Sequence, residues 1–84
     1  MDNWDAAAGT LRALVVRFED KLTERDVENI WELINVGELG IAFETLCTQL
    51  DEYDVVLDHM LWREFAEVGG RLTVDPKYWN YLKP

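Results

Sequence analysis

The chain has 84 residues, of which 49% are hydrophobic and 30% charged, and its formal net charge is −9. This composition is typical of one small globular domain and excludes a disordered chain. The N-terminus is acidic where a signal peptide is basic, and the apolar runs are too short to span a membrane. A single cysteine, Cys47, allows no internal disulfide, so we expect a protein of the reducing cytoplasm.

The excess negative charge lies entirely in the middle of the chain. No lysine or arginine occurs between Arg25 and Arg63, whereas the rest of the chain balances eight acids with eight bases. The nine acids of this stretch, which contains no lysine or arginine, are Asp26, Glu28, Glu32, Glu38, Glu44, Asp51, Glu52, Asp54 and Asp58. Nucleic acid needs basic side chains for its phosphates, so this block disfavours direct nucleic-acid binding and favours a basic protein partner. Solubility alone also explains an acidic surface.

The first two predicted elements form a helical hairpin. Apolar residues recur at spacings of three and four in both helices, which is the pattern of one buried face. In the first helix these residues are Trp4, Ala7, Leu11, Leu14, Val15, Phe18 and Leu22, and in the second they are Val27, Ile30, Trp31 and Ile34. Asp2, Asn3 or Asp5 can cap the first helix, whose firm part is expected from residue 8. The second opens at Thr23 or Glu24 and ends at Gly37.

The third predicted helix spans residues 38 to 54 and has two contrasting faces. Its apolar stripe contains Leu39, Ala42, Phe43, Leu46, Cys47, Leu50 and Tyr53. The other side carries only acids, although opposite charges four residues apart would stabilise an exposed helix. At 100° per residue, Ile41 lies on this outer side among the acids, where an exposed hydrophobic residue suits a binding patch.

The fourth predicted helix begins after Asp54, which can cap it, and ends at Gly69-Gly70. Its apolar stripe contains Leu57, Met60, Leu61, Phe65, Val68 and, later, Leu72. Glu64 falls inside this stripe, so we expect a buried ion pair with Arg71 or with an arginine of the first helix. Trp62 points off the stripe and serves either as a second contact surface or as cover for the C-terminal residues.

A short aromatic helix is predicted at the C-terminus, because Asp75-Pro76 combines an N-cap with a proline at the first helical position. It contains Tyr78, Trp79, Tyr81 and Leu82. The predicted fold is therefore all-α: a small antiparallel bundle of four helices with a short C-terminal helix, forming one domain over residues 1–84.

The sequence offers little material for catalysis or metal binding. It has one histidine, His59, one cysteine and no serine. The acids between Asp51 and Asp58 resemble a calcium loop, but they lack its glycine and include three consecutive apolar residues. The carboxylates lie on helix surfaces, where their pKa values stay ordinary. We therefore predict a binding protein that is not an enzyme and that has no cofactor and no metal site.

The central run resembles a known family. The residues that carry the pattern are Gly37, Glu38, Ala42, Glu44, Leu46, Cys47, Leu50, Glu52, Tyr53 and Asp54. With a Gly-Glu turn, an Ala-x-Glu-x-Leu-Cys-x-x-Leu core and a Glu-Tyr-Asp ending, the chain is similar to the MafI-type immunity proteins of bacterial polymorphic-toxin and contact-dependent inhibition systems. The resemblance covers about residues 10 to 82. It implies a cytoplasmic protein that binds and neutralises a cognate toxin domain, often a nuclease.

We therefore expect an acidic helical surface that occupies the basic cleft of a toxin, an RNase or DNase, or binds beside that cleft. The residues predicted to bind this partner are Glu38, Ile41, Glu44, Asp51, Glu52, Asp54, Asp58 and Trp62. For Glu38 and Asp54 the alternative is a role in capping helix ends. The alternative function is a non-enzymatic helical adaptor, or a structural subunit that self-associates through Trp62 or the C-terminal aromatic residues.

Overall fold

Four α-helices make up most of the computed structural model, which describes residues 3–84 and the side chains from residue 5. They are α1 (Asn3–Phe18), α2 (Glu24–Asn35), α3 (Leu39–Glu52) and α4 (His59–Arg71). Three single 3-10 turns are the other helical elements, namely η1 (Glu19–Lys21), η2 (Pro76–Tyr78) and η3 (Asn80–Leu82). The described part is 78% helical without a strand, which confirms the all-α prediction. The expected caps Asp2 and Asn3 and the expected core residue Trp4 lie outside the residues or side chains described.

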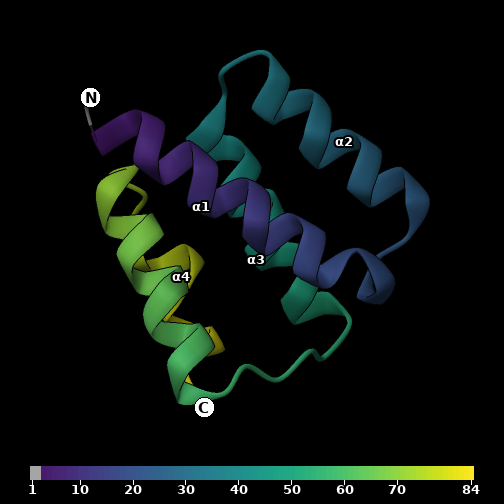
Figure 1. Cartoon of the computed structure of the whole chain (residues 1–84). Coiled ribbons are helices and arrows are strands. Elements are labelled where there is room, and N and C mark those ends of the chain that lie inside the picture. The colour runs from purple at the N-terminus through teal and green to yellow at the C-terminus, as the bar shows by residue number, and fades with distance from the viewer. Residues whose placement is uncertain (1–2) are drawn as a thin grey trace.

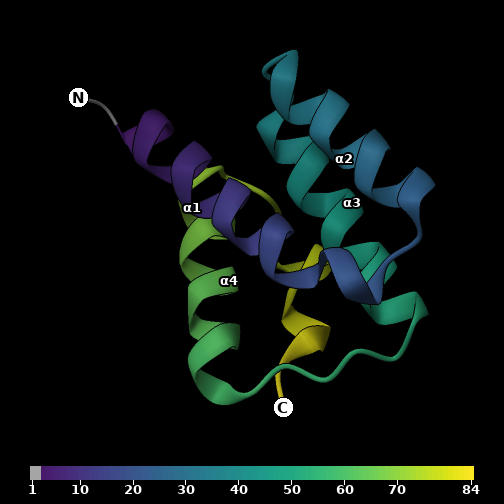
Figure 2. The same cartoon turned by 45° about the vertical axis from the view of Figure 1, so that its right-hand side comes forward.

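Consecutive helices run in opposite directions (Figure 1). Figure 2 shows α2 and α3 side by side, with α1 and α4 on the other side of the bundle. The C-terminal tail, residues 73–84, lies between α3 and α4, and its first 3-10 turn contacts both helices. The Cα radius of gyration is 11.6 Å, close to the ~12 Å expected for a compact chain of this length.

The core follows the apolar stripes predicted from the sequence. The buried residues common to prediction and structure include Leu11, Leu14, Val15, Phe18, Ile30, Ile34, Phe43, Leu46, Leu50, Leu57, Phe65 and Val68. Phe65 lies at the centre, because its ring contacts Phe18 at a centroid distance of 5.9 Å and Phe43 at 5.8 Å. Phe65 therefore connects α4 to both α1 and α3.

Three helices end with the same backbone motif, in which one residue takes a left-handed conformation. These residues are Gly37 after α2, Asp54 after α3 and Thr73 after α4, with φ of 84°, 54° and 54°. In each case the next N–H donates to a carbonyl five residues back, at 2.9 Å. Only the first of these closures uses glycine, and the glycine end predicted for the fourth helix is replaced by Thr73.

The prediction that Gly69-Gly70 ends the fourth helix is wrong, because α4 continues to Arg71. The prediction that Asp54 caps this helix is also wrong. Asp58 is the N-cap, since its Oδ1 accepts a hydrogen bond from the Leu61 N–H at 2.8 Å. The side chain of Asp54 therefore has no capping role, although its backbone closes α3.

Two residues predicted for the apolar stripes are exposed. Met60 is 76% exposed in the first turn of α4, and Tyr53 is 43% exposed just after α3. Tyr53 is exposed because its hydroxyl donates to Asp26 Oδ2 on α2 at 3.0 Å, in place of entering the core. Helix α1 also begins earlier than predicted, at Asn3, and includes Gly9 without interruption.

The expected buried ion pair of Glu64 is a long surface contact. Its Oε2 lies 3.9 Å from Arg17 Nη1 of α1, and both side chains are about half exposed. Arg71 pairs with Glu67 at 2.7 Å. At the C-terminus the expected helix is present as the 3-10 turns η2 and η3, and Asp75 caps the first of them by accepting from the Lys77 N–H at 3.0 Å.

Gly69 is inside α4 because Trp79 of the C-terminal tail packs directly against its backbone. A Cβ at this position would meet the indole Nε1 and lie 2.8 Å from Cδ1 and 2.9 Å from Cε2. The neighbouring Gly70 is exposed, with nothing within 4 Å of an added Cβ. The first glycine therefore has a packing function that the second lacks.

We expect Gly69→Ala and Gly70→Ala to change stability in opposite directions. Gly70→Ala should raise the free energy of unfolding by about 0.5–1 kcal/mol through helix propensity. Gly69→Ala should lower it by roughly 1–3 kcal/mol, because the indole must move out of its packed position. Urea denaturation of the two variants checks this pair, and a stabilising Gly69→Ala would show that Trp79 does not pack as described.

Candidate protein-binding site

The C-terminal end of α3 carries a group of exposed acids that we name the acidic end: Asp51, Glu52 and Asp54. The first two occupy the last turn of the helix, and the third is the left-handed residue that closes it. The Asp54 N–H donates to the Asp51 carbonyl at 3.1 Å, so the backbone fixes these two residues one turn apart. All three side chains are exposed to solvent.

No cation neutralises the acidic end within the described part of the chain. The ion pairs among those residues join Arg17 to Glu64 and Arg71 to Glu67, on α1 and α4. A further acid, Asp26 of α2, is linked to the chain at this end of α3, because its carboxylate accepts the hydrogen bond from Tyr53. This hydrogen bond raises the pKa of the Tyr53 hydroxyl, because the phenolate would face a carboxylate.

The helix dipole adds to the negative potential at this end. The C-terminus of a helix carries a partial negative charge, which lysine and arginine normally complement, and each acid placed there costs about 0.3–1 kcal/mol. The last turn of α3 contains no basic residue. The acidic end is therefore a locally unfavourable arrangement in the free protein, and a cationic partner would relieve it.

Glu44 lies in a different environment from the acidic end. It is half-buried in the middle of α3, close enough to Cys47 for its charge to affect the thiol. Burial and, to a lesser extent, this carboxylate raise the pKa of Cys47 far above its ordinary value of 9.0. The thiol therefore stays protonated in the folded protein and behaves as a small core hydrophobic group.

We expect Cys47 to react with iodoacetamide on the order of a hundredfold more slowly in the folded chain than in the unfolded chain. Moving the thiol by one residue, in Cys47→Ala/Thr48→Cys, should restore fast labelling because Thr48 is exposed. The free energy of unfolding should also fall above pH 9.0, since only the unfolded thiol ionises there. Mass spectrometry measures the labelling, and equal rates for the two cysteine positions would contradict the buried placement.

The predicted partner-binding residues occupy four parts of the structure: the acidic end, Glu44 in the middle of α3, the N-terminal end of α3, and α4. Glu38 and Ile41 lie at the N-terminal end of α3, roughly 20 Å along the helix axis from the acidic end. Ile41 is 48% exposed, which confirms the outward position predicted for it. Glu38 is the N-cap residue but makes no side-chain hydrogen bond there, so its carboxylate does not cap α3.

Asp58 and Trp62 belong to α4 and are engaged within the chain. Asp58 caps the helix, and the half-buried Trp62 packs against Trp79 at a ring-centroid distance of 6.0 Å. The ammonium group of Lys83 lies 5.4 Å from the Trp62 ring centroid. Of the two alternatives for Trp62, the structure supports cover for the C-terminal tail.

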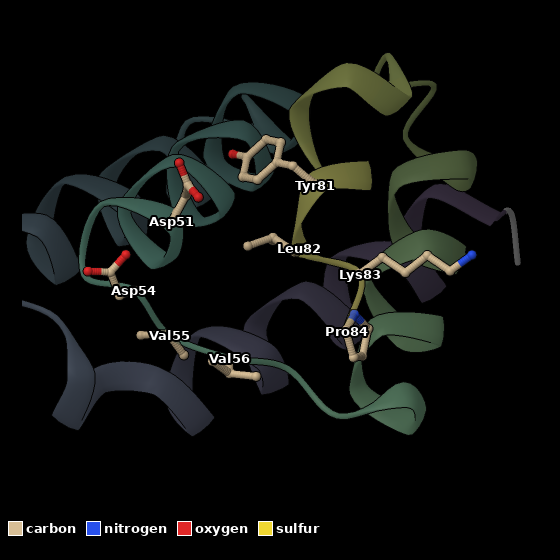
Figure 3. Close-up of a pocket in the computed structure, with 8 residues that line it drawn as sticks. All are labelled: Asp51, Asp54, Val55, Val56, Tyr81, Leu82, Lys83 and Pro84. Carbon is tan, nitrogen blue, oxygen red and sulfur yellow. The ribbon is translucent and has the colours of Figure 1, made fainter.

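The structure adds residues that the sequence analysis did not assign to a site. Val56, 84% exposed, follows the acidic end directly in the connecting loop, and Tyr81 of the tail reaches α3 beside Asp51 (Figure 3). Burial and then the neighbouring Cys47 and Asp51 raise the pKa of the Tyr81 hydroxyl. The apolar Val55-Val56 pair directly after a helix end was a visible signal in the sequence, whereas the position of Tyr81 depends on how the tail folds back.

Histidine, cysteine and carboxylate side chains within the described residues form no group of three or more that could hold a metal ion. None of the helices within residues 3–84 combines the length and hydropathy that a membrane span requires.

No protein-family model, no curated protein and no solved structure matches the chain.

Proposed function

We propose that the chain is an immunity protein that binds and neutralises a cognate bacterial toxin domain in the cytoplasm. The toxin is a basic nuclease, and the acidic helical surface around the C-terminal half of α3 covers or blocks its active-site cleft. In this proposal the protein acts by stoichiometric binding, not by catalysis, and contacts the toxin rather than nucleic acid.

The observation that carries the proposal is the acidic end itself. Asp51, Glu52 and Asp54 are exposed, lack a cation among the described residues and lie at the negative end of a helix dipole. Such an arrangement lowers the stability of the free chain, so packing and capping do not account for it. A basic cleft would gain affinity and a faster encounter from the same charges.

The resemblance to MafI-type immunity proteins supports the same function through the residues of α3 and its flanks. The alternative, a self-associating structural subunit, relied on exposed aromatic residues near the C-terminus. Trp62 and Trp79 pack against each other within the chain, and both are only partly exposed. The two tryptophans proposed for self-association are therefore engaged inside the chain, whereas Tyr81 of the tail stays exposed.

Co-expression tests the proposed function in cells. The candidate partner is the C-terminal domain of a large secreted protein, sought in the gene immediately upstream, and it is produced from an inducible promoter with or without the chain. We expect growth only when the chain is present, because binding removes the free toxin. Death of cells in which both proteins accumulate in soluble form would contradict the immunity function for that pair.

A further inference from the structure

A groove lies beside the acidic end, between the loop that follows α3 and the C-terminal tail (Figure 3). Its volume is about 240 Å³. The lining residues are Asp51, Asp54, Val55, Val56, Tyr81, Leu82, Lys83 and Pro84. One side of the groove is therefore acidic, whereas the rest is largely apolar with one aromatic ring. This combination of surfaces points to a ligand with a cationic head and an aliphatic stem.

The one cation among the lining residues does not neutralise the carboxylates. In Figure 3 the side chain of Lys83 points away from Asp51 and Asp54. Its ammonium group is held over the Trp62 ring, with 5.4 Å between the nitrogen and the ring centroid. The acidic side of the groove is thus open to a cation from outside the chain.

We propose that this groove receives an arginine side chain of the protein partner. The guanidinium would hydrogen-bond the carboxylates of Asp51 and Asp54, which the backbone fixes one turn apart, and stack on the Tyr81 ring. Its methylene groups would cover the exposed Val56 and the neighbouring apolar lining. A planar fork of donors fits two adjacent carboxylates better than the compact ammonium of lysine does.

A second groove on the same molecule provides a matched comparison. Its volume is about 320 Å³, and its lining residues are Glu19, Leu22, Glu24, Val27 and Glu28. It is also acidic and apolar, but it lies at the N-terminal end of α2, where the helix dipole is positive. One of its carboxylates, Glu19, already accepts a hydrogen bond from Trp31 Nε1 at 3.2 Å. If carboxylates simply attracted any cation, a cationic ligand would bind in both grooves. The proposed site predicts binding in the first groove only.

The inference rests on the proposed function for the identity of the partner, but the site can be tested on the chain alone. The probes are the amides of Nα-acetyl-arginine, Nα-acetyl-citrulline and Nα-acetyl-lysine, titrated into the isotope-labelled chain and followed by two-dimensional NMR. The arginine probe should shift the backbone amides of Val55, Val56 and Tyr81 in a saturable way, with a dissociation constant on the order of millimolar. Citrulline, its uncharged isostere, should leave them unchanged, and lysine should bind more weakly.

The Asp51→Asn/Asp54→Asn variant should weaken the arginine probe about tenfold or more, whereas the charge-matched Glu24→Gln/Glu28→Gln variant should not. Asparagine keeps the left-handed backbone at position 54 accessible. Equal binding of citrulline or lysine, equal shifts at Leu22 and Val27, or shifts that depend on chain concentration would each overturn the arginine site. The last outcome would assign the groove to a second copy of the chain.

Measuring the affinity of the same two variants for the toxin domain tests the groove and the proposed function separately. Loss of affinity only for Asp51→Asn/Asp54→Asn is the expected result. Unchanged affinity of that variant would overturn the groove as the anchor while leaving the immunity function intact. If the wild-type chain bound no toxin, the proposed function would fail, and the probe titration would still decide whether the groove binds arginine.

Discussion

Phe65→Ala is expected to lower the free energy of unfolding by about 3–5 kcal/mol. The Phe65 ring is fully buried and contacts both Phe18 and Phe43, so its removal leaves a cavity between three helices. A domain of 84 residues typically has a total stability of about 4–13 kcal/mol, so this loss removes a large fraction of the stability of the chain. Urea denaturation followed by circular dichroism measures the loss.

Met60→Ala is the matched control in the same helix. Met60 is exposed, so its truncation should change the free energy of unfolding by less than about 0.5 kcal/mol. A loss of several kcal/mol for Met60→Ala, or of less than about 1 kcal/mol for Phe65→Ala, would mean that α4 presents a different face to the core.

Asp51→Lys/Glu52→Lys is expected to stabilise the free chain and weaken its complex with the toxin domain. Reversing both charges complements the dipole of α3 and should raise the free energy of unfolding by roughly 0.5–2 kcal/mol. The association rate with a basic toxin should fall about tenfold or more at low salt, because the surface that steers the encounter has lost its charge. Denaturation and stopped-flow mixing measure the two effects on the same variant.

The matched control is Glu64→Lys/Glu67→Lys, which changes the net charge by the same amount on α4. Both residues have ion-pair partners, Arg17 and Arg71, so this variant should lose stability rather than gain it. If the control slowed association as much as the double reversal on α3, net charge rather than the acidic end would govern binding. A less stable Asp51→Lys/Glu52→Lys would show that the acidic end is not an unfavourable arrangement.

The fold could be predicted from the sequence because its information is local and periodic. The apolar spacing in α1, α2 and α3 identified nearly every buried residue of those helices, and Gly37 marked the end of α2 correctly. The ends of α3 and α4 were harder to predict, since Asp54 and Thr73 take the left-handed conformation without being glycines. Gly69 appeared to be a helix end because nothing local shows that Trp79 packs on it.

The candidate site was only partly accessible from the sequence. The block of acids without lysine or arginine is visible in the sequence. The sequence alone does not show which of these acids lie close together in the folded chain. The structure places Glu38 and the acidic end at opposite ends of α3, and assigns Asp58 to capping. The groove depends on the tail folding back so that Tyr81 and Leu82 reach the loop after α3, a contact between residues far apart in the chain.

Isothermal titration of the chain with the proposed toxin domain, sought in the gene next to that of the chain, tests the central claim most directly. The experiment is repeated from about 50 mM to about 500 mM NaCl, a range over which exposed charges become screened. We predict a one-to-one complex whose affinity falls steadily as the salt concentration rises. Absence of a complex at low salt, or an affinity that does not change with salt, would contradict a toxin-binding surface built on the acidic end of α3.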